Sequence, residues 1–151
     1  MALLRYVLFA SLCVLITGKE TILTPCPEND VSVCEVTEAR IEPCNNYPCQ
    51  LKRKKYASIS FDIVPQFAAN NLTTMVYHPE GTNDREFTGF GSTNGCEYTK
   101  CPTEVGVKQT INYSLYTRIN KLLPKGEFEI KWKVWNIEEP KQSCCFMTTI
   151  A

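Results

Sequence analysis

The segment "PCNNYPCQLKRKKYASISFDIV", residues 43–64, decides the fold class of this chain. From Ala57 to Ile63 every odd-numbered residue is apolar or small and every even-numbered residue is polar. Because successive side chains of a strand point to opposite faces, this alternation predicts a half-buried β-strand. Cys44 and Cys49, with four residues between them, lie just ahead of it. The segment therefore raises the question of why a short cysteine-flanked loop should precede a strand.

Other segments repeat the strand pattern. Residues 107–119 place Ile111, Tyr113 and Leu115 on one face, residues 127–134 alternate charged with apolar side chains, and residues 143–150 are typical of a last strand. Turn signals separate these segments at residues 43–48, 79–84, 89–95 and 123–126. Several short strands with turns between them, and no helical periodicity, predict an all-β fold, an antiparallel β-sandwich of two sheets.

The alternation breaks after Val134, because Trp135 and Ile137 fall on the charged face of the predicted strand. A β-bulge near Val134 would turn both side chains inward, and we predict such a bulge. An exposed tryptophan is the alternative.

The first 18 residues resemble a secretory signal peptide. Arg5 precedes an apolar run from Tyr6 to Ile16, and Thr17 and Gly18 follow. The run is shorter than the roughly 20 residues that span a bilayer, so we predict a signal peptide over 1–18, a secreted protein, and a single domain over 19–151. Without residues 1–18 the charged residues nearly balance, which gives no electrostatic basis for binding nucleic acid.

Eight cysteines remain once Cys13 is removed with the signal peptide. An even number of cysteines in a secreted chain predicts four disulfides. Zinc binding is the alternative, but C-x4-C spacing is loose for zinc ligands and an oxidising compartment favours disulfides. Eight cysteines allow 105 pairings, so their spacing alone leaves the connectivity open.

Two Asn-X-Ser/Thr triplets, at Asn71 and Asn112, predict glycosylation sites. Asn112 lies on the polar face of its predicted strand, where a glycan would have room.

No catalytic constellation is evident. The one histidine, His78, lies in "VYHPEGTND", which has the composition of a turn, and no nucleophile motif accompanies it. We therefore expect no enzyme activity, no cofactor and no bound metal. The run Lys52–Lys55 is either a solvated strand entrance or a contact for anionic lipid headgroups.

An ordered set of segments resembles a known family. It comprises "TPCP" at 24–27, "ARIEPCNNYPCQLKRKKYASISFDI" at 39–63, "CEYTKCP" at 96–102 and "WKVWNIEEPKQSCCF" at 132–146. Together these resemble the ML (lipid-recognition) family, and most closely its arthropod Niemann-Pick type C2-like branch. The resemblance implies an immunoglobulin-like sandwich with an apolar cavity between its sheets.

The resemblance also implies disulfide pairs. They are Cys44–Cys49, which closes the short loop ahead of the strand, Cys96–Cys101, and Cys26–Cys145, which ties the chain ends. Cys34 and Cys144 depart from the family's usual six cysteines. We expect Cys34–Cys144, with the swapped pairs 26–144 and 34–145 as the alternative.

The family's function implies one apolar ligand held between the two sheets. The residues expected to contact it are inward-facing apolar side chains, and Phe87 or Phe90 together with Phe128 correspond to aromatic positions at the family's pocket mouth. The full set is Ile59, Phe61, Ile63, Val76, Phe87, Phe90, Ile111, Tyr113, Leu115, Phe128, Ile130, Trp132, Val134 and Phe146.

Three functions fit this resemblance. The first is a monomeric secreted carrier of a sterol, fatty acid or apolar semiochemical, with transient membrane or receptor contact. The second is innate-immune recognition of microbial lipid with a receptor partner, which basic residues and an exposed apolar patch at the mouth would favour. The third is a disulfide-stapled structural domain whose interior is filled by its own side chains.

Overall fold

A computed structural model describes residues 23–81, 83–87, 91–116 and 126–151. The predicted signal peptide over 1–18 and Phe90 lie outside these residues. The strands are β1 (Thr24–Pro25), β2 (Cys34–Glu42), β3 (Tyr56–Pro65), β4 (Leu72–Glu80), β5 (Asn83–Glu86), β6 (Gln109–Tyr116), β7 (Phe128–Asn136) and β8 (Ser143–Ile150). One 3-10 turn, η1 (Gly95–Glu97), lies between β5 and β6.

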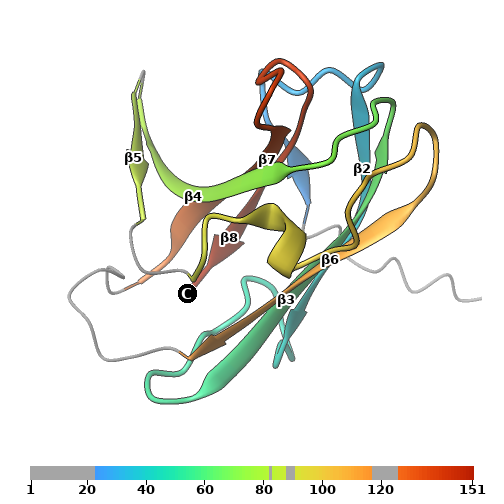
Figure 1. The fold of residues 1–151 in the computed structure, drawn as a ribbon. Helices are drawn as coiled ribbons and strands as arrows, with labels where there is room; N and C mark the ends of the chain where they lie inside the picture. The colour runs from blue at the N-terminus through green and yellow to red at the C-terminus, as the bar shows by residue number, and fades with distance from the viewer. Residues whose placement is uncertain (1–22, 82, 88–90, 117–125) are drawn as a thin grey trace, which may run out of the picture.

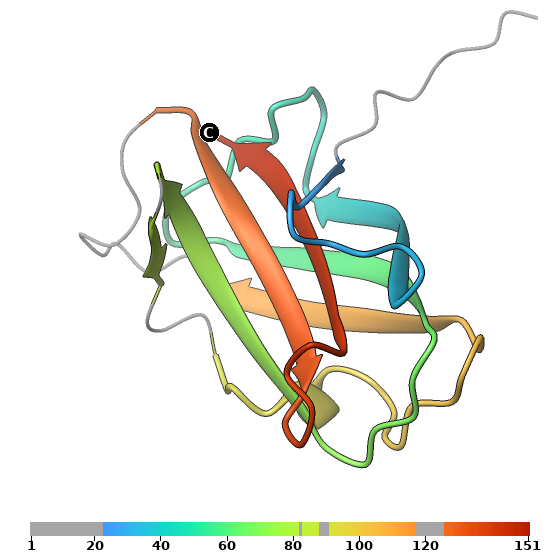
Figure 2. The same cartoon turned by 90° about the horizontal axis from the view of Figure 1, so that it is seen from above.

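The strands form two antiparallel sheets that pack face to face (Figure 1). One sheet has the order β1-β8-β7-β4-β5 and the other the order β2-β3-β6. Seen from above, β4, β7 and β8 run across the strands of the three-stranded sheet (Figure 2). The predicted antiparallel sandwich of two sheets is confirmed.

The three strands predicted from alternation and the predicted last strand begin and end within two residues of their predicted bounds, where the structure describes them. β3, β6, β7 and β8 match the predicted segments, and the described part of residues 107–119 ends in strand at Tyr116. His78 was expected in a turn but lies in β4, opposite Arg85 of β5. The turn is narrower than its composition suggested, since Gly81 has a φ of 64° and supplies the positive φ that a tight reversal needs.

The predicted bulge in β7 is wrong. β7 pairs with β8 without a register shift from Phe128 to Trp135, so Trp135 faces outward half-buried and Ile137 is 57% exposed. Asn136 explains why the strand ends there. Its side chain is buried, bonds Gln142 at 2.8 Å and accepts from the N–H of Glu138 at 3.0 Å, which closes the β7–β8 turn.

Four disulfides join the eight cysteines: Cys26–Cys145, Cys34–Cys144, Cys44–Cys49 and Cys96–Cys101. Cys26–Cys145, Cys44–Cys49 and Cys96–Cys101 are the pairs that the family resemblance implies. Cys34–Cys144 is the pair expected for the two additional cysteines, and the swapped pairs are not formed. Cys144 belongs to the core between the sheets, whereas its neighbour Cys145 faces the other side of β8. Consequently Cys34–Cys144 joins the two sheets from inside, and Cys26–Cys145 fixes the N-terminal segment to the outer face of β8.

Aromatic side chains fill the middle of the sandwich. Phe61 from β3 packs against Phe146 and Trp132, with ring centroids 4.6 Å and 6.5 Å away. Tyr113 from β6 lies 5.0 Å from Trp132. The core therefore spans both sheets, and aromatic contacts supply much of the area between them.

Candidate functional site

The inward faces of the two sheets bring most of the predicted ligand-contacting residues together. One buried cluster contains Ile59, Phe61, Ile63, Val76, Phe87, Ile111, Tyr113, Ile130, Trp132, Val134 and Phe146. Phe128 is half-buried against the same cluster. Leu115 lies in β6, but its side chain is outside the described part of the structure, as is Phe90.

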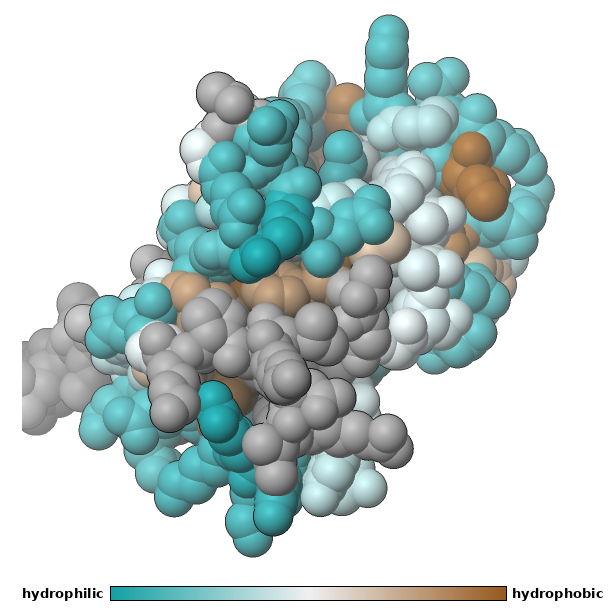
Figure 3. Space-filling view, turned by 90° about the vertical axis from the view of Figure 1, so that its left-hand side faces the viewer, coloured by the Kyte–Doolittle hydropathy of each residue, from teal (hydrophilic) through white to brown (hydrophobic). Residues whose placement is uncertain are grey.

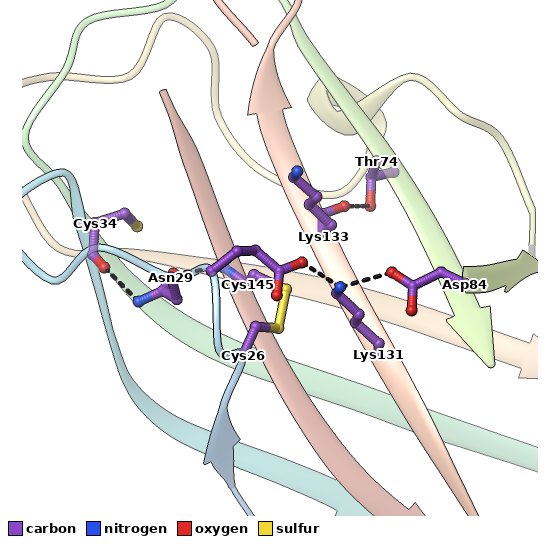
Figure 4. Close-up of a disulfide and its surroundings, with 9 residues drawn as sticks. Cys26, Asn29, Cys34, Thr74, Asp84, Lys131, Lys133 and Cys145 are labelled. Carbon is purple, nitrogen blue, oxygen red and sulfur yellow. Dashed lines mark hydrogen bonds and ion pairs between the residues drawn. A yellow bond between two sulfur atoms is a disulfide. The ribbon is translucent and has the colours of Figure 1, made fainter. Parts of the chain in front are cut away.

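A short hydrogen-bonded group lies within this apolar cluster. Tyr113 from the three-stranded sheet bonds Thr74 of β4, and the Thr74 hydroxyl donates to the carbonyl of Lys133 at 3.2 Å (Figure 4). Burial raises the pKa of Tyr113, and its hydrogen bonds with Thr74 and Trp132 offset only part of that effect. The phenol is therefore neutral and acts as a fixed hydrogen-bonding group that joins the two sheets.

Three aromatic rings mark one end of the sandwich, which we call the aromatic end. His78, Phe87 and Phe128 lie with ring centroids between 5.9 Å and 6.3 Å apart. His78 Nδ1 lies 3.0 Å from the carbonyl oxygen of Glu129, and since a carbonyl only accepts, Nδ1 carries the proton. Figure 3 views this side of the molecule, and apolar atoms reach the surface there below hydrophilic side chains.

The short Cys44–Cys49 loop lies at the same end. Cys49 forms a bridge with Ile150, the last residue of β8, and Ile150 pairs with Phe128. The Tyr47 hydroxyl accepts from the N–H of Thr149 at 3.3 Å. The disulfide loop ahead of β3 thus holds the end of β8 beside the aromatic end, which answers the question raised by its position in the sequence.

The basic run also lies at the aromatic end, because it leads directly into β3. Residues 52–55 are all exposed. The next residue, Tyr56, is 72% exposed and its ring lies 4.9 Å from that of Tyr116, which is 47% exposed. Sequence reasoning did not place this run relative to the sandwich.

The outer faces hold the charged networks. On the five-stranded sheet, Lys131 is only 7% exposed and its ammonium contacts Glu28 and, at 2.6 Å, Asp84 (Figure 4). Burial alone would lower the pKa of Lys131, but the hydrogen bonds with Asp84 and Glu28 outweigh it and raise that pKa. Lys131 therefore fastens the N-terminal segment and β5 to β7.

Asp62 is the centre of a second network, on the outer face of the three-stranded sheet. Its carboxylate receives hydrogen bonds from Arg40 at 2.8 Å and Thr110 at 2.7 Å, and forms an ion pair with Lys108 at 2.8 Å. The hydrogen bond from Arg40, with those from Lys108 and Thr110, holds the pKa of Asp62 well below its usual range, although burial opposes this. With these charges outside, the described inward faces are apolar apart from a few neutral polar side chains and His78.

The described residues offer binding surface and no evident catalytic or metal chemistry. Cys26, Glu28 and Cys145 lie close together, but both thiols are used in a disulfide and cannot act as thiolate ligands. His78 Nδ1 bonds a backbone carbonyl, and no described carboxylate bonds the ring to orient it as a general base. No helix in the described part of the chain is long and apolar enough to cross a membrane.

The fold and interior define an antiparallel β-sandwich with an apolar core shared by both sheets, and comparison with known proteins defines the family. The model of the ML domain matches residues 20–151. The MD-2-related lipid-recognition protein of Manduca sexta is 46% identical over 153 residues, covering 99% of this chain and 97% of that protein. The chain belongs to the ML (lipid-recognition) domain family.

A solved structure supports the same fold. The crystal structure of a Niemann-Pick type C2 protein from the Japanese carpenter ant superposes with a TM-score of 0.69, covering 86% of this chain and 99% of that one. The two sequences are 18% identical, so this likeness shows the fold alone.

Proposed function

We propose that this chain is a secreted carrier that holds one hydrophobic ligand, a sterol, fatty acid or apolar semiochemical, between its two sheets. The observation that carries the proposal is the continuous apolar cluster on both inward faces, which reaches the surface at the aromatic end. The sheets are joined from inside by Cys34–Cys144, at the start of β2 and of β8, which is the opposite end of the sandwich. At the aromatic end the Cys44–Cys49 loop holds β8, so we expect the sheets to separate on the β4–β5 side of that end to admit a ligand.

The energetics suit an acyl chain or a sterol. Each methylene transferred from water gains about 0.8 kcal/mol, so a dozen buried methylenes offer roughly 10 kcal/mol before other terms. Lost motion of the ligand and ordering of the protein remove a large part of that gain. We expect micromolar or tighter binding, by a monomer whose domain spans 19–151 after removal of the signal peptide over 1–18.

Native mass spectrometry of the secreted protein, followed by extraction and identification of bound lipid, tests the proposal. A stoichiometric sterol, fatty acid or similar lipid is the expected result. A lipid-free protein that also takes up no fluorescent fatty-acid or sterol probe would refute the carrier function and favour a structural role.

A matched pair of variants locates the ligand. Phe128→Ala removes a ring of the aromatic end, and Trp135→Ala removes a larger ring from the outer face of the same strand. We expect Phe128→Ala to lower the affinity for a fluorescent fatty-acid probe by about fivefold or more, since about 1 kcal/mol of apolar contact with the ligand is lost. Trp135→Ala should leave it unchanged. Equal effects of the two variants would place the ligand elsewhere.

A second candidate function is recognition of an anionic microbial lipid together with a receptor. It is favoured by the exposed run Lys52–Lys55 beside the exposed pair Tyr56 and Tyr116 at the aromatic end. Binding to phosphate-bearing lipid A vesicles, compared with neutral phosphatidylcholine vesicles, tests it. Equal binding to both surfaces at physiological salt would exclude this function.

A further inference from the structure

Six polar or charged side chains are buried in the described part of the chain, and one of them differs from the rest. They are Asp62, Thr74, Thr103, Lys131, Asn136 and Thr148. The first five have hydrogen-bond partners for their side chains. The hydroxyl of Thr148, a residue only 2% exposed, has no partner among the residues that the structure describes.

Thr148 belongs to the inward face of β8. It lies between Phe146 and Ile150 on that face, and it is paired with Ile130 of β7. One step further along the same two strands, Phe128 pairs with Ile150 at the aromatic end. Two residues of a strand span about 7 Å, so the unpartnered hydroxyl lies a short distance inside that end of the sandwich.

The placement of Thr148 is unfavourable for the protein alone. An unpartnered hydroxyl inside a protein keeps the full desolvation cost of the group. Valine has nearly the same shape and the strand preference of threonine, so it would fill the position without that cost. A threonine here is accounted for if another molecule supplies the missing hydrogen bond.

We propose that Thr148 is a hydrogen-bonding anchor for the polar group of the bound lipid. The inference rests on the proposed carrier function and names the ligand class, a lipid with a neutral hydroxyl or carbonyl oxygen that enters between the sheets. A threonine hydroxyl donates to a carbonyl and both donates to and accepts from a hydroxyl. Among the described inward-facing residues of β4, β7 and β8 there is no lysine or arginine, so a charged carboxylate would lack a dedicated cationic partner there.

Binding of two lipids of equal length tests the anchor. 1-Hexadecanol and hexadecane compete with a fluorescent probe for delipidated wild-type protein, Thr148→Val, Thr148→Ser and the control Thr149→Val. Thr149 is the neighbouring residue on the opposite face of β8. We expect Thr148→Val to lose about two- to tenfold in affinity for hexadecanol, which is the change expected for the loss of one hydrogen bond. Its affinity for hexadecane should not fall. Thr148→Ser should keep most of the hexadecanol affinity.

The same variant gives a second readout without ligand. Because the unpartnered hydroxyl is removed, delipidated Thr148→Val should melt about 3–5 °C above the wild type. Equal hexadecanol binding by wild type and Thr148→Val would overturn the anchor while leaving the carrier function intact. A wild-type protein that binds neither lipid would overturn both.

Discussion

The two long disulfides should stabilise the fold in a strongly coupled way. Cys26–Cys145 and Cys34–Cys144 span 119 and 110 residues, and in the chain-entropy model either bridge alone contributes about 5 kcal/mol. Their ends nearly coincide, since Cys144 and Cys145 are adjacent. Once one bridge is present, the second closes only a ring made of residues 26–34 and 144–145. Such a ring has about ten residues and contributes about 2.7 kcal/mol.

The stability lost when the long bridges are removed should therefore depend on whether one or both are absent. Each double variant, Cys34→Ala with Cys144→Ala or Cys26→Ala with Cys145→Ala, should lower the free energy of unfolding by about 3–4 kcal/mol, including some lost packing. All four cysteines are buried, so the packing contribution is similar for both pairs. The quadruple variant should lose about 2 kcal/mol more than the sum of the two double variants.

Urea unfolding of the purified proteins under non-reducing conditions measures these differences. The pair Cys44–Cys49 is the control, because its short ring is independent of the long bridges and its removal should add to either double variant without coupling. A loss of 5 kcal/mol or more from each long pair by itself would refute the shared-loop reasoning. So would strict additivity in the quadruple variant. If the quadruple variant does not fold, the two double variants still decide the first point.

Three other predictions concern the outer faces. Asp62→Asn should lower the free energy of unfolding by about 2 kcal/mol at pH 7. Because the pKa of Asp62 is lowered in the folded state, the wild type loses this contribution as the pH falls below about 4. In urea unfolding from pH 7 to 2, the free energy of unfolding should therefore decline less steeply for the variant than for the wild type. Lys131→Met should lower the free energy of unfolding by about 1 kcal/mol at neutral pH. Since the pKa of Lys131 is raised in the folded state, the difference in unfolding free energy from wild type, measured by urea unfolding, should disappear only above about pH 10.5. Asn71 and Asn112 are both exposed, so each should carry one glycan. Asn71→Gln and Asn112→Gln should each reduce the glycan mass that peptide N-glycosidase F releases, as measured by mass spectrometry. An unchanged released mass would show that the site is unused.

Strict alternation was the most informative signal in the sequence. β3 is a half-buried strand whose inward residues alternate with outward ones, so its periodicity alone placed Phe61 in the core. Phe146 of β8 was placed there by the family resemblance, because Ser143–Met147 does not alternate. Three of the four disulfide pairs and the ligand-contacting set came from the family resemblance, because neither pairing nor cavity lining is encoded in a period of two. Cys34–Cys144 was expected because these two cysteines remained after the family's three pairs.

The elements that periodicity missed have physical reasons. β2 carries polar residues at most positions, because it is an edge strand with one side exposed, and its register shifts between Val36 and Glu38. Near its end, β4 contains the pair His78-Pro79, which has the composition of a turn. Pro79 is tolerated there because it lies beyond the last β4 residue that pairs with β7, Tyr77. Neither strand could be predicted from local composition, because pairing with neighbouring strands determines both.

The same limit applies to the site. An inward-facing isoleucine or phenylalanine has the same pattern in the sequence whether it packs against another side chain or against a lipid, so alternation alone cannot distinguish a core from a ligand-binding interior. A buried polar residue can distinguish the two, because its side chain requires a hydrogen-bond partner, either in the protein or in the ligand. Thr74 and Thr148 occupy inward positions of the same alternation, and the sequence could have marked both. Thr74 finds Tyr113 and the backbone of Lys133 within the fold. Thr148 finds no partner in the described residues, and that difference is what makes it informative about the ligand.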